Sequence, residues 1–169
     1  MKKWLIFLTL ISLLAGFSIA AAKWKTFNGA FFDISYPATF KAIPSLKSGY
    51  MPEKYDSARF ISPDKQVEFY VLAPMWNADA AEIAVNPKTE KVVSEREEEG
   101  RLDFSGIIET IKQVTIKAKD GSYLRSYIDT EGDNNTRLIF GIKYRNMKAY
   151  ESYKADYLQF KKSIRQYSD

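Results

Sequence analysis

Alternating apolar and polar residues predict that most of the chain folds as β-strands. Two short runs, 24–27 and 31–36, flank Asn28-Gly29, a dipeptide typical of tight hairpin turns. A second pair of runs, 58–61 and 67–72, flanks a turn with proline at its first central position. Since alternate strand residues point to the same side, Val67, Phe69 and Val71 are expected to share one buried face.

The second half of the chain continues this pattern. Residues 107–118, 123–130 and 137–144 read as three strands joined by hairpin turns, with a bulge expected at Ile107-Ile108, where alternation breaks. The intervening segments are less regular. Residues 41–55 read as a loop, 77–84 as a short helix, and the charged run 95–99 as a solvated strand face or loop.

One amphipathic helix is expected, over residues 147–166, with Asn146 as its N-cap. Its apolar residues recur at steps of three and four, which places them on one stripe. They are Tyr150, Tyr153, Tyr157, Phe160 and Ile164. The predicted fold class is therefore α+β, with a twisted antiparallel sheet and a C-terminal amphipathic helix packed on it.

The N-terminus has the layout of a secretory signal peptide. A positive Met1-Lys2-Lys3 head precedes an apolar run, 4–19, and small residues follow it. Cleavage is expected after Ala22, with Ala20 as the second possibility. The alternative is a membrane anchor, but the run is short for a spanning helix, which needs about 20 apolar residues. We predict a periplasmic or secreted single domain, residues 23–169, without a membrane span.

Composition narrows the chemistry. The chain of 169 residues contains no Cys and no His, which excludes disulfides, cysteine nucleophiles, Ser-His-Asp triads and zinc sites that use histidine. Removing residues 1–22 with their two lysines lowers the formal net charge from +4 to +2. Such a small excess does not indicate a nucleic-acid partner. We expect no cofactor and no enzymatic activity.

Two groups of residues are candidates for binding. The acidic turn Asp129–Asn135 places Asp129, Glu131 and Asp133 at the first ligand positions of a calcium loop, but Asn134 and Phe140 stand where that loop needs Gly and Glu. We therefore predict no metal site there, while cation binding by this turn stays an open alternative. The second group lies in loops rather than in periodic elements and is proposed to line a binding surface. It comprises Tyr50, Met51, Met75 and Trp76.

Short motifs resemble the PsbP-like family. Phe32-Asp33-Ile34-Ser35-Tyr36-Pro37, followed by Phe40, is similar to the opening strand of these domains, and Phe160-Lys161-Lys162-Ser163 resembles their closing helix. The likeness covers about residues 24–166. It implies an α/β/α sandwich and non-enzymatic binding, and it transfers no functional residue, because the matching positions are packing positions.

The sequence thus leads to three functional hypotheses. The favoured one is a binding or accessory domain of the cell envelope that acts through its surface on an unidentified protein partner, as a monomer or weak dimer. The alternatives are a carrier of a small apolar ligand held between helix and sheet, and a hydrolase that uses two carboxylates across a cleft.

Overall fold

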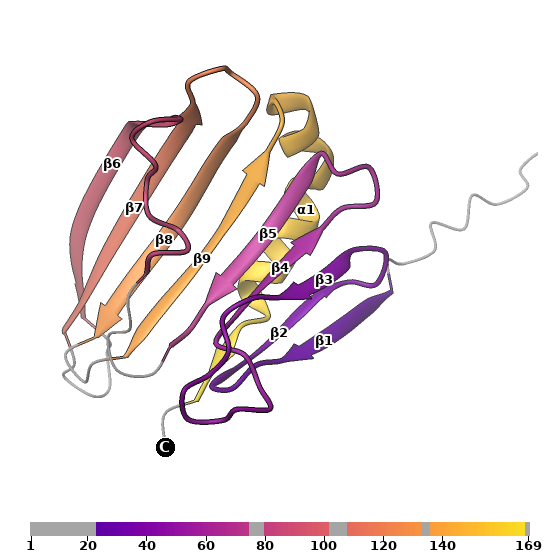
Figure 1. Cartoon of the computed structure of the whole chain (residues 1–169), viewed down its shortest axis with the longest axis vertical. Coiled ribbons are helices and arrows are strands. Elements are labelled where there is room, and N and C mark those ends of the chain that lie inside the picture. The colour runs from indigo at the N-terminus through magenta and orange to yellow at the C-terminus, as the bar shows by residue number, and fades with distance from the viewer. Residues whose placement is uncertain (1–22, 75–79, 102–107, 133–135, 168–169) are drawn as a thin grey trace, which may run out of the picture.

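The computed structural model describes residues 23–74, 80–101, 108–132 and 136–167 (Figure 1). These residues form ten strands and one helix. The strands are β1 (Trp24–Asn28), β2 (Phe32–Pro37), β3 (Lys41–Pro44), β4 (Ser57–Ile61), β5 (Val67–Leu72), β6 (Glu90–Arg101), β7 (Ile108–Ala118), β8 (Leu124–Gly132), β9 (Arg137–Tyr144) and β10 (Arg165–Gln166), and the helix is α1 (Met147–Lys162). The predicted signal peptide lies outside the described residues.

The strands form two antiparallel sheets. A seven-stranded sheet has the order β3-β4-β5-β9-β8-β7-β6, and a small sheet has the order β1-β2-β10. The expected hairpins at Asn28-Gly29, at residues 62–65 and at residues 119–122 all form. Strands β6 to β9 make a meander, and β9 then pairs with β5, so this pairing joins the two halves of the large sheet (Figure 1).

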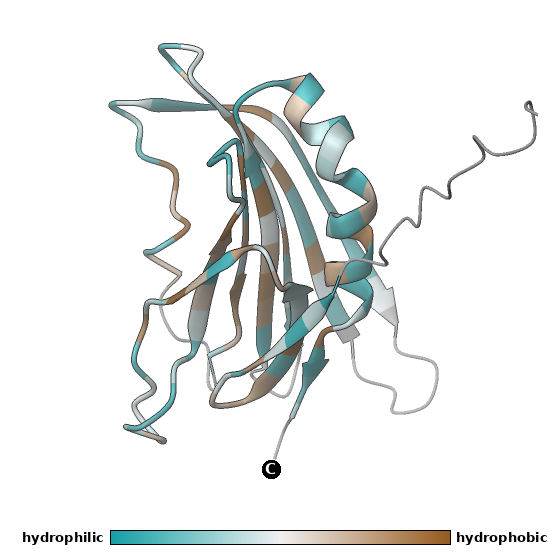
Figure 2. Ribbon diagram, turned by 90° about the vertical axis from the view of Figure 1, so that its right-hand side faces the viewer, coloured by the Kyte–Doolittle hydropathy of each residue, from teal (hydrophilic) through white to brown (hydrophobic). Residues whose placement is uncertain are grey.

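Helix α1 covers one face of the large sheet, on the part formed by β5 and β9, and also contacts β2 (Figure 2). It begins where predicted, because the Asn146 side chain accepts a hydrogen bond from the backbone N–H of Ala149 at 2.9 Å. Every residue of the predicted stripe packs against the core. Tyr157 and Phe160 are buried, and the three others are partly buried.

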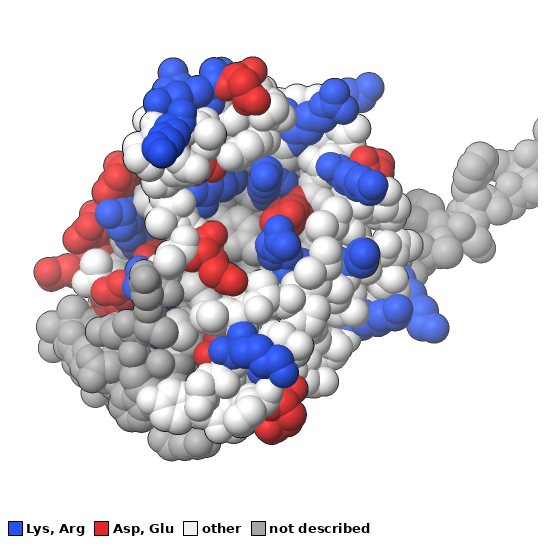
Figure 3. All heavy atoms as spheres, viewed as in Figure 1, with Lys and Arg blue, Asp and Glu red and all other residues white. Residues whose placement is uncertain are grey.

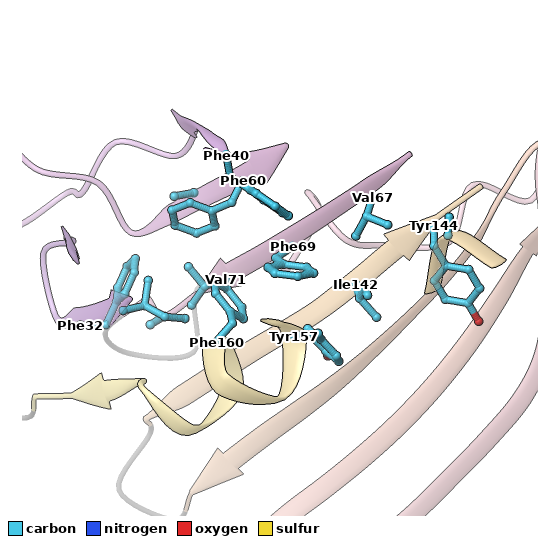
Figure 4. Packing of buried hydrophobic residues seen from close by; sticks show 14 residues of the cluster. Phe32, Phe40, Phe60, Val67, Phe69, Val71, Ile142, Tyr144, Tyr157 and Phe160 are labelled. Carbon is cyan, nitrogen blue, oxygen red and sulfur yellow. The ribbon is translucent and has the colours of Figure 1, made fainter. Parts of the chain in front are cut away.

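The main core lies between this helix and the sheet (Figure 4). Val67, Phe69 and Val71 share the buried face of β5 as predicted, and Phe69 lies 5.1 Å from Phe160 between ring centroids. The opposite face of β5 is also buried. There Tyr70 and Leu72 pack with other apolar residues in a second, smaller cluster, which includes Ile83 and Ile139.

The structure corrects several details of the sequence-based prediction. The described residues contain one helix, so the fold is more sheet-dominated than the expected α/β/α sandwich, and the face of the large sheet opposite α1 meets the irregular segment 80–89 instead. That segment begins with turns rather than with the expected helix, whose first residues, 77–79, lie outside the described residues. Strand β3 forms within the predicted loop.

The C-terminal helix is also shorter than predicted. It ends at Lys162, because Ser163 donates from its backbone N–H to Gln159 and Phe160 and from its hydroxyl to Phe160. The chain then continues into β10, and Ile164 still reaches the core from an extended backbone. The charged run 95–99 lies within β6, as one of the two options predicted. A register shift occurs in β6, between Val92 and Ser94, whereas Ile107 lies outside the described residues.

None of the helices in the described part of the chain is long and apolar enough to span a membrane.

At Gly141 in β9, the Tyr70 side chain and the backbone of β8 come close to the backbone of β9. A Cβ at this position would collide with the Tyr70 ring and with the Ser126 carbonyl oxygen. We expect Gly141→Ala to lower the free energy of unfolding by about 1–3 kcal/mol, the usual cost of overpacking a core. Gly49→Ala is the matched control, because nothing lies within 4 Å of its added methyl group. Equal melting temperatures of the two variants would contradict the packing of Tyr70 against β9.

Candidate binding face

The face of the large sheet opposite α1 carries a row of side chains at matching register positions. Lys41 in β3 pairs with Ile61, Ile61 pairs with Glu68, Glu68 with Lys143, and Lys143 with Arg125 in β8. Because residues directly opposite one another in a sheet point to the same side, these five form one row across five strands. We call them the cross-sheet row. No described helix covers this face (Figure 1), and Lys41, Glu68 and Lys143 are fully or partly exposed on it.

Arg125, at one end of the row, is buried and fully bonded. Its guanidinium donates two hydrogen bonds of 2.8 Å to the two carboxylate oxygens of Glu90, and two more to the backbone carbonyls of Ile83 and Ala84. Glu90 also accepts from the Tyr123 hydroxyl at 2.6 Å and from the backbone N–H of Asn86. This cluster ties the irregular segment 80–89 to the sheet, since Ile83, Ala84 and Asn86 each hydrogen-bond to Arg125 or Glu90.

These contacts fix the protonation states in the cluster. Hydrogen bonds from Arg125 lower the pKa of Glu90 to about 2, and the hydrogen bond to Glu90 raises the pKa of Tyr123 to about 12. Burial raises the pKa of Tyr70, which lies on the same face. Near neutral pH Glu90 is therefore ionised and both tyrosines are protonated. None of the three has a pKa close to the working pH, as an efficient general acid or base requires.

Two adjoining open pockets occupy this face. The first, of about 440 Å³, lies between the sheet and segment 80–89 and includes Arg59, Glu82 and the Glu90–Arg125 pair. The second, of about 520 Å³, lies at the end of the sheet where β4 turns into β5, and Lys41 and Arg145 belong to its lining. Both pockets share Glu68, Tyr123 and Lys143, so they form one concavity. Figure 3 views this face and shows Lys and Arg side chains around its hollowed centre, with acidic side chains among them.

Lys143 occupies the middle of the concavity. Its ammonium nitrogen lies 4.0 Å from the centroid of the Tyr123 ring, in a cation–π contact. Arg59 lies 3.9 Å from a Glu68 carboxylate oxygen, and both side chains are partly exposed. Such an exposed ion pair contributes little to stability, so its charges are available to a ligand.

Arg137 binds two carboxylates of the acidic turn that begins at Asp129. Arg137 donates to both carboxylate oxygens of Asp129, at 2.9 and 2.7 Å, and lies 3.1 Å from Glu131. Two of the three carboxylates considered as calcium ligands are thus paired with a cation of the protein. The third, Asp133, and its neighbours 134–135 lie outside the described residues.

The structure describes two of the four residues that were proposed as a binding surface. Tyr50 is 63% exposed and its ring lies 6.1 Å from that of Phe31, edge to face. Met51 packs against the small cluster of Ala30 and Phe31. Both belong to the loop between β3 and β4, whereas neither lines the concavity. Met75 and Trp76 lie outside the described residues.

Sequence reasoning missed the cross-sheet row, although one signal was present. Arg125 is a charged residue inside a strand whose neighbours Leu124, Ser126 and Ile128 alternate with it, so its face had to be polar or its charge had to be paired. The partner, Glu90, lies 35 positions away in the sequence. Only the register of the sheet and the path of segment 80–89 bring the two together.

No protein-family model matches this chain, and no curated protein matches it. Its fold is similar to the solution structure of cyanobacterial PsbP (CyanoP) from Synechocystis sp. PCC 6803, with a TM-score of 0.51 and 8% sequence identity, over 92% of this chain and 99% of that chain. A crystal structure from Bacteroides thetaiotaomicron VPI-5482 aligns with a TM-score of 0.44 and 14% identity, over 88% of this chain and 49% of that chain.

At this identity the similarity concerns the fold and not the function. The antiparallel sheet, the terminal helix and the almost complete alignment with CyanoP agree with the resemblance that the Phe32–Pro37 and Phe160–Ser163 motifs indicated. The chain therefore has a PsbP-like fold.

Proposed function

We propose that this protein is an exported, non-enzymatic binding or accessory domain that acts through its surface on a protein partner of the cell envelope. The observation that carries the proposal is the open concavity on the face of the large sheet opposite α1, which we call the helix-free face because no described helix covers it. The sheet register and the Glu90–Arg125 cluster fix the positions of the strands that carry its charged groups. A solvent-open surface on a sheet suits recognition of a partner, because the backbone that carries it needs no ordering on binding.

The chemistry of the concavity supports binding over catalysis. Glu90 stays ionised and Tyr123 stays protonated near neutral pH, so neither can exchange a proton with a substrate there. Glu82, another acid of the first pocket, accepts a hydrogen bond of 2.7 Å from the Ser57 hydroxyl. A hydrolase that uses two carboxylates needs one of them as a proton donor, and Glu90 does not provide it.

The alternative of an apolar-ligand carrier has less support. It requires space between helix and sheet, and over β4 and β5 that interface is filled by aromatic rings. Beside them lies an open hollow of about 330 Å³, which Tyr150, Tyr157 and Lys161 of α1 line in part. Phe160 contacts Phe60 and Phe69 with centroid distances of 5.4 and 5.1 Å, and Phe69 contacts Tyr157 at 5.3 Å. Close-packed rings leave no room for a second apolar molecule.

Site-specific photocrosslinking tests the proposed face. A photoreactive residue at Arg59, on the concavity, is expected to give a discrete crosslinked product in cells, and an excess of unmodified protein should suppress it. The same residue at Leu158, which is exposed on the outer side of α1, should give no such product. A product formed equally from both positions, or from neither, would contradict recognition through the helix-free face.

A further inference from the structure

We propose that the second pocket of the helix-free face recognises an extended, acidic and partly apolar segment of a protein partner, with two acidic residues four positions apart and an aliphatic residue midway between them. The inference rests on the proposed function and specifies the partner's chemistry. It follows from three observations: the excess of cations around the pocket, its apolar floor, and the spacing of its strands.

The pocket has an excess of positive charge. Four cationic side chains line it, from the start of β3, the end of β9 and the turn between β4 and β5: Lys41, Lys65, Lys143 and Arg145. Glu68 is the one carboxylate among its lining residues, and Arg59 already lies 3.9 Å from it. Cations of one sign around a concave surface focus the electrostatic potential and attract an anionic ligand.

Most of these cations are unpaired within the domain. In residues 23–74, 80–101, 108–132 and 136–167, no carboxylate lies within 4.0 Å of the charged groups of Lys41, Lys65 or Arg145. The nearby Asp64 carboxylate accepts hydrogen bonds from the Ser62 hydroxyl and the Gln66 backbone N–H, which hold it within its own turn. The cations are thus free to bind a carboxylate from outside.

The floor of the pocket is apolar and favours a ligand that carries more than charge. Ile43 and Ile61, on the face opposite α1, line it together with Tyr123. A small inorganic anion would make no hydrophobic contact with these groups. Aliphatic side chains placed between carboxylates would cover them and add hydrophobic contact to the ion pairs.

The spacing of the strands suits an extended peptide. Lys41 and Lys143 belong to the cross-sheet row and lie on strands separated by three strand spacings, roughly 14 Å. About four extended residues span this distance at roughly 3.3 Å each, and alternate side chains of such a segment point to the same side. Two acidic residues four positions apart can therefore face the sheet at the same time, together with an aliphatic residue midway between them. A flat anionic membrane surface cannot enter a concave pocket in this way.

Calorimetric titration with two synthetic peptides tests the inference on the full mature chain. A capped pentapeptide with Asp at both ends, Leu in the middle and Ser between them (the Asp/Leu peptide) is expected to bind, and its affinity should fall when the salt concentration is raised from about 50 to about 200 mM, because exposed ion pairs are screened. The isosteric Asn/Leu peptide should show no measurable binding. Equal binding of the two peptides, or no binding of the acidic one, would overturn the inference.

Two matched triple variants locate the interaction. Lys41→Gln/Lys65→Gln/Arg145→Gln removes three exposed, unpaired cations of the pocket and should abolish detectable binding of the Asp/Leu peptide, since each exposed ion pair contributes roughly two- to fivefold to affinity. Lys91→Gln/Lys117→Gln/Lys162→Gln removes the same charge from exposed positions elsewhere and should bind like the unmodified chain. Equal loss in both variants would overturn the inference, because net charge alone would explain it.

Two further measurements separate the inference from other outcomes. Cosedimentation with phosphatidylglycerol vesicles should show no binding that depends on the pocket cations; vesicle binding lost only in the pocket variant would assign these cations to a membrane instead. Crosslinking from position 59 that persists in the pocket variant would leave the proposed function standing and overturn the acidic-segment inference. Absence of crosslinking from position 59 when the pocket cations are intact, with peptide binding retained, would instead contradict the proposed function.

Discussion

Replacing Phe160 by Ala is expected to lower the free energy of unfolding by about 3–5 kcal/mol, the usual cost of emptying a large aromatic site in a core. Phe160 is fully buried at the point where α1, β4 and β5 meet, and it contacts both Phe60 and Phe69 (Figure 4). Urea denaturation measures the change. Because contacts on both sides are lost, the surrounding rings cannot all relax into the space.

Leu158→Ala is the matched control, since Leu158 lies in the same helix with 47% of its surface exposed. Its effect should stay within about 0.5 kcal/mol, the usual range for surface positions. Tyr153→Ala should fall between the two variants, because its ring meets Phe40 edge to face but remains partly exposed. Similar unfolding midpoints for the Phe160 and Leu158 variants would contradict the packing of the aromatic stripe on the sheet.

Glu90→Gln is expected to have the second large effect, a loss of about 3–5 kcal/mol, because it leaves the buried Arg125 guanidinium without its counter-ion. The double variant Glu90→Gln/Arg125→Met removes both charges and should regain much of this loss. Thermal and urea unfolding measure both changes. A double variant no more stable than the single one would contradict the assignment of the loss to an unpaired charge.

The same ion pair predicts a pH dependence. Arg125 lowers the pKa of Glu90 to about 2 in the folded state, from an ordinary value of 4.5. A carboxylate whose folded pKa is lowered stabilises the protein above its unfolded pKa, and this contribution is lost as the pH falls through the folded pKa. The stability difference between the unmodified chain and Glu90→Gln should therefore be full above about pH 5 and shrink towards pH 2. A difference that is constant over this range would contradict the pair.

Local patterns predicted those parts of the fold that depend on neighbouring residues. The Asn28-Gly29 hairpin, the N-cap at Asn146 and the aromatic stripe of α1 each lie within a short stretch of sequence, so period and turn chemistry suffice to identify them. The end of the helix was misplaced because Ile164 continues the apolar stripe in sequence, while the Ser163 cap has already turned the chain out of the helix.

The candidate site could not be predicted in the same way, because its residues come from distant strands. Glu68, Lys143 and Arg125 become neighbours only through the pairing of β5 with β9 and of β9 with β8. No local signal fixes that register or the strand order. Tyr50 and Met51 were proposed because they interrupt regular patterns, and the structure places them in a loop away from the concavity.

The pairing of β5 with β9 has a consequence for how the chain reaches its native state. Strands β3 to β5 and strands β6 to β9 can each assemble from contacts close in sequence, but joining them pairs β5 with β9, two strands separated in sequence by residues 73–136. A pairing so distant in sequence has an entropic cost before any new contact compensates for it, which makes this step slow. Helix α1 contacts both β5 and β9, so it can dock fully only after the two halves have met. The concavity spans the same seam, and the protein therefore acquires its candidate binding surface in the last, cooperative step of folding.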